Sequence, residues 1–495
     1  MTPSHSLGGT TLLLICITLV VGYALWRTIH QLFSHPLAKV PGPKLYALSG
    51  LPYALQLVRG NAPMALKQLH DVYGPVVRYS PNDVSFISAS AWRQIYGHRK
   101  AGNPAFDKDL RQYRESLTGA PNILIANDAD HTRMRRLLSH AFSEKALRGQ
   151  QGILRHYVDL LIQKLDERMT AGAAVDISQW YNFTTFDIIG DLCFGEPFGC
   201  LESGGYHAWV AMIFDGFRFS TLRHAIKRMP FFKHILKPFL PKSLIKAARE
   251  HLQLSFAKAK QRVERGHVER DDFMSYILRH NDKKGMTANE IGENSNILIL
   301  AGSETTATLL SGITYHLLKR PYTYRLLVEE ISSAFKTEEE IDPLALNRLQ
   351  YLAAVIKEGF RMYPPVPANL GRKVPKGGRE IDGYWLPGDT VVSVAAWSAY
   401  QSNLNFHLPN TFCPERWLGD SRFDDDEKDV LQPFSFGPRD CIGKNLAYAE
   451  ARLILVRLLW KFDLELMPDS INWSSQAIYL FWDKGPLNIT LKPRR

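Results

Sequence analysis

One cysteine of this chain lies in a glycine-punctuated loop that leads directly into an apolar helical pattern. The loop reads FSFGPRDCIGK (434–444) with the cysteine at position 441, and the helical pattern extends from Leu446 to Trp460. Backbone N–H groups at a helix N-terminus stabilise a nearby thiolate. A thiolate held by such a loop can bind a haem iron axially and push electron density onto it.

Ordinary burial is the alternative for Cys441, because most intracellular cysteines are small core residues. Burial does not require Gly437, Arg439 and Gly443 at fixed offsets, whereas a haem loop does. Gly437 would allow a sharp turn beneath a flat macrocycle, Arg439 can pair with a propionate, and Gly443 would let the next helix approach closely. The pattern Phe-x-x-Gly-x-Arg-x-Cys-x-Gly, which starts at Phe434, resembles the cysteine-ligand loop of the cytochrome P450 superfamily of haem-thiolate monooxygenases. The resemblance implies that this loop binds haem b and that Cys441 is the axial ligand of its iron.

A polar motif, AGSETT (301–306), lies inside an apolar helix predicted over about 289–320. A carboxylate beside a hydroxyl in such a helix is costly unless it is used, although local hydrogen bonding is the alternative. Thr305 can bond to the carbonyl four residues earlier and open the helix, and Gly302 would leave a groove for dioxygen and water. The motif resembles the oxygen-activation segment of the family. It implies that Glu304 and Thr305 pass protons during oxygen activation.

Glu358 and Arg361 lie three residues apart on one predicted helix face. Such a pair alone is a weak signal, because exposed helical pairs are common and contribute little. It is followed by FCPERW (412–417), and the combination resembles the Glu-x-x-Arg helix of the family and its completing arginine. The resemblance implies a buried structural network of Glu358, Arg361 and Arg416 that fixes the loop of Cys441.

A basic helix begins with HTRMRR (131–136), where the family often has Trp-x-x-x-Arg. His131 replaces the tryptophan, and an imidazole N–H can donate a hydrogen bond as an indole N–H does. The resemblance implies that His131, Arg135 and Arg372 join Arg439 in binding the haem propionates.

The chain is basic, with 60 Lys and Arg against 49 Asp and Glu and a formal charge of +11. Such a balance suits nucleic acid, a membrane surface or an acidic partner. No long basic run and no nucleic-acid motif is present, so nucleic acid is not an expected partner. Arg133 and Arg136 lie either on a solvated face or, with Lys444, on a docking face for an acidic electron donor.

The N-terminal segment 7–26 is uncharged and long enough to span a bilayer. Positive charge follows it from Arg27 onward, which disfavours a cleaved signal peptide and places the rest of the chain in the cytosol. A buried N-terminal helix is the alternative. The proline-rich run 36–43 then forms a stiff hinge. We therefore expect an anchor over 1–35 and a catalytic domain over 36–495, in a single-pass protein of the endoplasmic reticulum membrane.

The remaining patterns predict one large domain, mainly α with small β-sheets, the cytochrome P450 fold by resemblance. The five scattered cysteines form no C-x-x-C pair, which suits a reducing compartment. The charged range 266–286 is predicted to be a solvated connection, and 400–433 an irregular meander. Strands are expected at 76–79, at 83–87 and within 371–395. Helices are expected at about 63–73, 130–172, 181–194, 206–217, 242–266, 289–320, 322–336, 348–363 and 446–460.

These motifs occur in one order over roughly residues 36–495, which is far rarer by chance than any single motif. The chain resembles fungal microsomal members that oxidise secondary metabolites such as terpenoids or polyketides. The resemblance implies insertion of one oxygen atom from O2 into a small apolar substrate. Electrons would come from NADPH through the FAD and FMN of an NADPH–cytochrome P450 reductase, with cytochrome b5 as a second candidate donor. Substrate contacts are implied at about 100–125, 205–240, 297–305, 366–370 and near 478–479.

Two other functions remain open at this point. One is a haem-thiolate isomerase or peroxygenase that needs neither O2 nor a reductase, against which the acid–threonine pair argues. The other is a non-catalytic, membrane-anchored binding protein.

Overall fold

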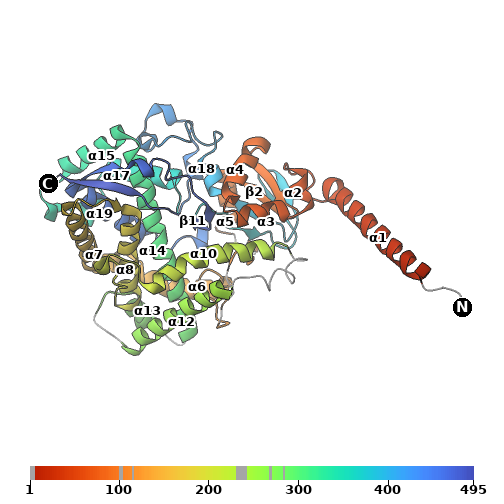
Figure 1. The fold of residues 1–495 in the computed structure, drawn as a ribbon, viewed down its shortest axis with the longest axis horizontal. Coiled ribbons are helices and arrows are strands. Elements are labelled where there is room, and N and C mark those ends of the chain that lie inside the picture. The colour runs from red at the N-terminus through yellow and green to blue at the C-terminus, as the bar shows by residue number, and fades with distance from the viewer. Residues whose placement is uncertain are drawn as a thin grey trace.

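A helical body and a smaller sheet-containing lobe make up most of the chain, and one long helix projects from the lobe (Figure 1). The computed structural model describes residues 6–99, 104–113, 116, 118–229, 242–266, 270–281 and 285–494. Parts of the implied substrate-contact ranges 100–125 and 205–240 lie outside these residues. The predicted class, mainly α with small sheets, is confirmed.

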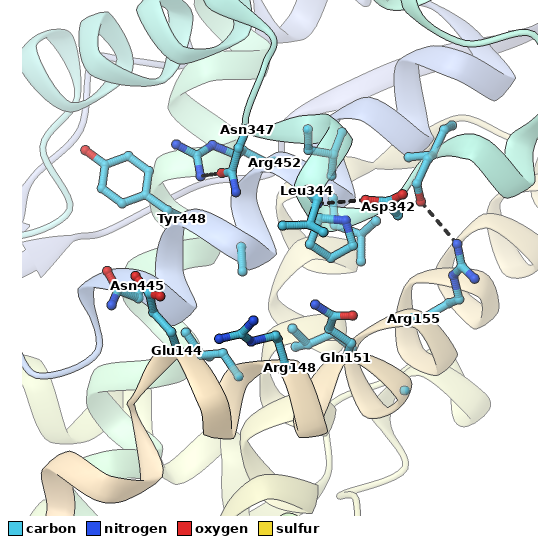
Figure 2. A pocket seen from close by; sticks show the side chains of 18 residues that line it. Glu144, Arg148, Gln151, Arg155, Asp342, Leu344, Asn347, Asn445, Tyr448 and Arg452 are labelled. Carbon is cyan, nitrogen blue, oxygen red and sulfur yellow. Dashed lines mark hydrogen bonds between the residues drawn. The ribbon is translucent and has the colours of Figure 1, made fainter.

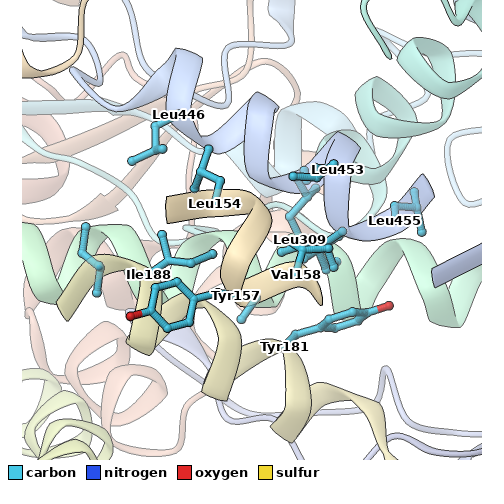
Figure 3. Close-up of a cluster of buried hydrophobic side chains, with 14 of the residues drawn as sticks. Leu154, Tyr157, Val158, Tyr181, Ile188, Leu309, Leu446, Leu453 and Leu455 are labelled. Atoms are coloured by element: carbon cyan, nitrogen blue, oxygen red, sulfur yellow. The ribbon is translucent and has the colours of Figure 1, made fainter. Parts of the chain in front are cut away.

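The helical body is organised around α14, which begins at a capping box formed by Thr287 and Glu290 and is buried along most of its length. Helix α8 packs along it, and the apolar faces of α7 and α19 complete the core (Figure 3). The helices of the body are α6 (Asp128–Ala141), α7 (Glu144–Thr170), α8 (Ile177–Phe194), α9 (Cys200–Ser203), α10 (Ala208–Lys227), α12 (Lys242–Glu264), α13 (Phe273–His280), α14 (Ala288–Leu318), α15 (Pro321–Ala334), α16 (Pro343–Leu346), α17 (Gln350–Met362) and α19 (Lys444–Lys461).

The lobe contains a five-stranded sheet in the order β1-β2-β8-β5-β3, in which only β2 and β8 run parallel. In its register Lys108 lies directly opposite Arg372. The strands of this sheet are β1 (Val76–Ser80), β2 (Asp83–Phe86), β3 (Asp107–Lys108), β5 (Arg372–Lys373) and β8 (Val391–Val394). The helices around it are α2 (Lys44–Leu48), α3 (Leu51–Val58), α4 (Ala62–Tyr73), α5 (Ala89–Tyr96) and α18 (Ala396–Tyr400).

Three smaller sheets complete the structure, and two of them use the C-terminal segment after α19. The strands of these sheets are β4 (Val175–Asp176), β12 (Asn488–Pro493) and β9 (Phe462–Leu466), the hairpin β6 (Arg379–Ile381) and β7 (Tyr384–Leu386), and the pair β10 (Ile478–Tyr479) and β11 (Phe481–Trp482). The β10–β11 pair places the C-terminal segment beside α10.

The N-terminal helix α1 (Ser6–Ile29) extends away from the lobe with its apolar side chains exposed (Figure 1). The apolar span Gly9–Ser34 contains 26 residues, none of them buried, so it is long enough to cross a membrane. Helix α14 is of similar composition, but 72% of its apolar window is buried, which makes it a core helix. The predicted apolar helix is therefore present, and its exposure is consistent with a membrane anchor.

The prediction of a solvated connection over 266–286 is wrong for α13. Asp272 caps this helix by accepting from the backbone N–H of Ser275, and Phe273 and Ile277 are buried beneath it. The charge of Asp272 is itself buried, in an ion pair with Arg262 at 2.9 Å. Charged residues here indicate an internal ion pair, which the sequence pattern alone does not distinguish from a solvated loop.

Candidate active site around Cys441

The cysteine loop makes a sharp turn just before α19. The backbone N–H of Cys441 donates to the carbonyl of Phe434 at 2.8 Å, which closes the loop. Gly437 has a φ of 79°, and a Cβ there would lie 2.1 Å from the carbonyl oxygen of Tyr96. Ser435 is also left-handed, with a φ of 63°. The loop therefore needs glycine at 437, as predicted, and presents an accessible Cys441 side chain.

Burial raises the pKa of the Cys441 thiol, because protein surrounds it on most sides although the side chain itself is accessible. A hydrogen bond from the Gly443 N–H and the charges of Arg135 and Lys444 act in the opposite direction, while Asp440 adds to the rise. The Gly443 N–H at the start of α19 thus favours the thiolate, as expected, while burial opposes it. A bound metal cation would deprotonate this thiol outright.

Two other predicted loop residues have contacts of different kinds. The ring of Phe434 packs against Phe360 at 5.0 Å and Tyr448 at 5.3 Å, so it joins the loop to α17 and α19. A Cβ on Gly443 would make only ordinary contacts, 3.8 Å from Phe142 and 3.9 Å from the sulfur of Cys441. The expected close helix approach at Gly443 is therefore wrong.

Four cationic or imidazole side chains meet near this loop. Lys108 and Arg372 face each other across β3 and β5, where like charges are unfavourable unless an anion lies between them. Burial and the charges of Arg372 and Arg439 lower the pKa of Lys108 well below its usual range. Burial, then Arg439 and Lys108, lower the pKa of His131 to about 4. The four groups form a cationic cluster that we define as Lys108, His131, Arg372 and Arg439.

Within the described residues, this cluster keeps unused hydrogen-bond donors. The buried Nη1 atoms of Arg372 and Arg439 have no hydrogen-bond partner. Arg439 is held from behind by Asp128 at 2.7 Å and the carbonyl of Ala126 at 2.8 Å. Positive charge and free donors at one place indicate a site for an anionic group. Lys108 was missed from sequence because only the strand register brings it opposite Arg372.

Two of the three arginines of α6 are occupied by protein groups. Arg135 donates to the carbonyl of Asp440 at 2.7 Å and to its carboxylate at 2.5 Å, so it fixes the residue before Cys441. Arg133 pairs with Glu290 at 2.5 Å and Asp130 at 2.8 Å. Arg133 therefore links α6 to α14, and its predicted place on a solvated face or a docking face is wrong. Arg136 is exposed.

The predicted network of Glu358, Arg361 and Arg416 is present and fully buried. Glu358 pairs with Arg361 at 2.7 Å and with Arg416 at 3.2 Å. It also accepts from the indole N–H of Trp417 at 3.0 Å and from the backbone N–H of Cys413 at 2.8 Å. Burial alone would raise the pKa of Glu358, but the two arginines hold it below its usual value.

The network contacts the meander (400–433) directly, and it reaches the cysteine loop indirectly, through Tyr400. Arg361 donates to the carbonyls of Tyr400 and Pro409 at 2.9 and 2.5 Å. The hydroxyl of Tyr400 then accepts from the N–H of Gln432, close to the start of the loop. Arg416 also pairs with Asp426, a buried partner that the motif did not reveal.

On α14, Thr305 donates to the carbonyl of Ala301 at 2.6 Å, as predicted, and the helix continues without a break. Gly302 does not open a groove. A Cβ there would lie 2.5 Å from the Cδ1 of Ile189, so the glycine allows α8 to pack closely and the predicted groove is wrong. The buried carboxylate of Glu304 pairs with Lys484 at 2.6 Å, a partner that sequence reasoning missed.

A separate cavity of about 630 Å³ opens between α7, α16 and α19, the helix that follows the cysteine loop (Figure 2). Arg148, Arg155 and Arg452 lie around it, above an apolar floor. Arg148 is exposed, whereas Arg155 and Arg452 donate to Ile341 and Asn347. The lining thus carries three arginines and two acidic residues, Glu144 and Asp342.

Together, an accessible thiol in a glycine turn, a cationic cluster and a buried arginine network define the class of haem-thiolate proteins. The family model described as Cytochrome P450 matches residues 41–482, and the chain belongs to this family. Cytochrome P450 monooxygenase astJ of Aspergillus oryzae is 45% identical over 478 residues, which cover 96% of this chain and 95% of that protein. Cytochrome P450 monooxygenase astA of Talaromyces wortmannii is 45% identical over 484 residues, 98% and 97% of the two chains. Cytochrome P450 monooxygenase efuB of Hormonema carpetanum is 44% identical over 475 residues, 95% and 94% of the two chains.

The chain is therefore a cytochrome P450 monooxygenase with the fold of that family, a haem-thiolate enzyme that depends on a redox partner. The residues present fit a haem. A soft sulfur donor is accessible in the loop, and the free Nη1 atoms of Arg372 and Arg439 suit the two carboxylates of its propionates.

Proposed function

We propose that Cys441 binds the iron of haem b and that this chain inserts one oxygen atom from O2 into a small apolar substrate. The observation that carries the proposal is the accessible Cys441 side chain in the turn before α19, which the Cys441 N–H closes by donating to the Phe434 carbonyl at 2.8 Å. When bound, a haem iron with a thiolate ligand activates dioxygen for insertion into a C–H bond. The loop supplies the sulfur and holds it in one position.

The cationic cluster would hold the propionates. Arg372 and Arg439 have free Nη1 donors, Lys108 would add amine N–H donors, and His131 supplies one N–H as a neutral imidazole. We assign Arg135 in addition the task of fixing Asp440 beside Cys441, since both groups already contact each other. Phe434 would support the loop from below through its packing on α17 and α19.

Arg372→Leu should weaken haem binding, because it removes a buried cation and leaves the opposing Lys108 alone with the anion. We expect the haem-to-protein ratio after gel filtration to fall by at least roughly half, since one charge-assisted hydrogen bond contributes about 1.5–3 kcal/mol. Lys373→Ala is the matched control, because Lys373 is the next residue of the same strand and is exposed. Equal haem ratios in both variants would contradict the assignment of Arg372.

Glu304 and Thr305 would conduct protons during oxygen activation. The Thr305 hydroxyl is held by the carbonyl of Ala301 at 2.6 Å and remains partly accessible, whereas Glu304 is buried. A positioned carboxylate and hydroxyl can pass a proton by breaking one O–H bond as the next one forms.

Thr305→Val should separate electron consumption from product formation, because valine keeps the shape of the side chain and removes the hydroxyl. We expect the product formed per NADPH consumed to fall by roughly tenfold, with hydrogen peroxide released instead. This loss is smaller than the 10²–10⁴-fold, roughly, that a proton-transfer group typically contributes. Thr306→Val is the control, since Thr306 is buried on another face of α14. Unchanged coupling in Thr305→Val would remove Thr305 from the proton path.

The electrons would come from NADPH through the FAD and FMN of an NADPH–cytochrome P450 reductase, with cytochrome b5 as a second donor. Exposed Arg136, Arg148 and Lys444 lie around the Cys441 loop and suit an acidic docking surface. The substrate class we propose is a secondary metabolite of the terpenoid or polyketide type.

We also propose that residues 1–35 form a single-pass anchor in the endoplasmic reticulum membrane and that residues 36–495 form the cytosolic catalytic domain. The exposed apolar surface of α1 and the positive charge that follows it support this orientation.

The experiment that tests the proposed function is turnover by the full chain in microsomes, with and without the reductase, assayed on candidate terpenoids and polyketides. A monooxygenase requires NADPH, O2 and the reductase together. Product formed from hydrogen peroxide alone, with no gain from reductase, would instead favour a peroxygenase.

A further inference from the structure

The carboxylate of Glu304 is held by a lysine from the C-terminal segment. The Nζ of Lys484 lies 2.6 Å from Oε1 of Glu304, and their side chains are only 5% and 1% exposed. Such burial leaves little screening of the pair, so removal of one partner strongly affects the other. The two residues are 180 positions apart, so the pair joins α14 to the segment after β11.

A hydroxyl completes this arrangement on one side of the carboxylate. Thr308 donates to Oε1 of Glu304 at 3.0 Å and accepts from Lys484 at 2.7 Å. Oε1 of Glu304 therefore accepts hydrogen bonds from both Thr308 and Lys484. Among the described residues, Oε2 of Glu304 is buried without a hydrogen-bond partner. One oxygen is therefore fixed while the other keeps its acceptor capacity.

Two tyrosines are the other titratable groups whose ionisation depends on Glu304. Burial raises the pKa of Tyr206 and of Tyr363, and the negative charge of Glu304 raises both further. Both therefore stay neutral and add no further negative charge beside Glu304. Lys484 is the cation that contacts this carboxylate.

The segment that carries Lys484 also contacts α10. Phe481 packs on Phe217 at 4.6 Å, and Asp483 pairs with Arg218 at 2.6 Å. These residues lie in or beside the ranges where the family resemblance places substrate contacts. Lys484 therefore belongs to a segment that packs against α10, one of the elements expected around the substrate.

We propose that Lys484 is a positioning residue for proton delivery, which holds the Glu304 carboxylate through Oε1 and leaves Oε2 free to accept and release protons. This inference rests on the proposed function of Glu304 and Thr305. In each transfer Oε2 takes a proton from a solvent hydronium ion, which becomes water as the new O–H bond forms, and that bond breaks when the proton passes to the next acceptor. Glu304 returns to a carboxylate that Lys484 again stabilises.

Lys484→Met tests the ionisation of Glu304 without turnover. A buried carboxylate deprived of its cation takes up a proton, so infrared difference spectra at neutral pH should gain a protonated carboxyl band. The band should disappear in the double variant Lys484→Met with Glu304→Gln. Glu450, whose pKa burial raises to about 8, contributes equally to every variant and cancels in the difference.

The same variant tests proton delivery in the haem-loaded, full-length enzyme with its reductase. Product per NADPH should fall by roughly tenfold in Lys484→Met, and Lys484→Arg should restore most of it. Lys492→Met is the matched control, because Lys492 forms a 2.8 Å ion pair with Glu465 in which both side chains are about two-thirds exposed (67% and 65%). Lys492→Met should form as much product per NADPH as the wild type.

The results of these two experiments separate the possibilities. A new carboxyl band together with lost coupling supports the role of Lys484. Absence of the band, or a band without any change in coupling, overturns it. If Lys484→Met fails to fold, Lys484→Gln is measured in the same two ways with the same criteria. If Thr305→Val and Glu304→Gln also couple normally, the proposed proton path itself fails, whereas normal coupling in Lys484→Met alone refutes only this inference.

Discussion

Cys441→Ser is expected to abolish the red-shifted absorption band that a thiolate-bound, reduced carbon monoxide complex shows. Serine removes the sulfur donor and leaves the loop hydrogen bond from the Cys441 N–H to Phe434 in place. Monooxygenase activity should fall by at least about 10³-fold, the scale of losing a group that acts directly in the chemistry. The measurements are the carbon monoxide difference spectrum, the haem content and NADPH-dependent turnover.

Two further variants make this result interpretable. Cys413→Ser changes a half-buried thiol outside the loop and should keep both the band and the activity. Cys441→His supplies a neutral imidazole ligand, so the protein should retain haem while losing the thiolate band. A wild-type spectrum in Cys441→Ser would remove the basis of the proposed function.

Glu358→Ala is expected to be the most destabilising single substitution in the arginine network. It leaves Arg361 and Arg416 buried with no carboxylate between them, and breaking such a buried pair costs about 3–5 kcal/mol. Since folded proteins are stable by only about 5–15 kcal/mol, we expect little soluble protein and a low haem content. The free energy of unfolding from urea titration measures the loss.

An exposed acidic residue offers the control for this prediction. Glu329 forms a 3.7 Å ion pair with Arg325 in which both side chains are more than half exposed, and Glu329→Ala should change stability by less than about 1 kcal/mol. Similar losses in Glu358→Ala and Glu329→Ala would contradict the structural role of the network.

The depressed pKa of Glu358 also gives this network a pH dependence of known sign. The folded carboxyl has a pKa below its usual value of 4.5, so the network stabilises the fold fully above that value and loses this contribution as the pH falls further. Glu358→Gln removes the titrating group. The stability difference between wild type and this variant should therefore shrink on acidification below about 4.5, the unfolded reference value.

Local motifs of the site could be predicted because their residues are close in sequence. The left-handed Gly437, the Thr305 bond to Ala301 and the Glu358–Arg361 pair each depend on the backbone of a few neighbouring residues. Helices were predicted where apolar periodicity is strong, but the predicted run 130–172 is two helices, α6 and α7, and α10 extends to Lys227 instead of ending near 217. The failure at α13 arose because its charges are compensated within the fold.

The loop around Cys441 is specific enough in sequence to indicate the family. The residue order alone establishes which chemical groups are present: one thiol in a glycine turn, an acid–threonine pair, the arginines and an apolar N-terminal segment. Only the tertiary structure decided which of these groups face one another. The balance of burial and charge at the Cys441 thiol, the opposition of Lys108 to Arg372, and the pairing of Lys484 with Glu304 all depend on long-range packing. Electrostatic energies depend on the distance between charges and on their solvent exposure, and both are set by the folded structure.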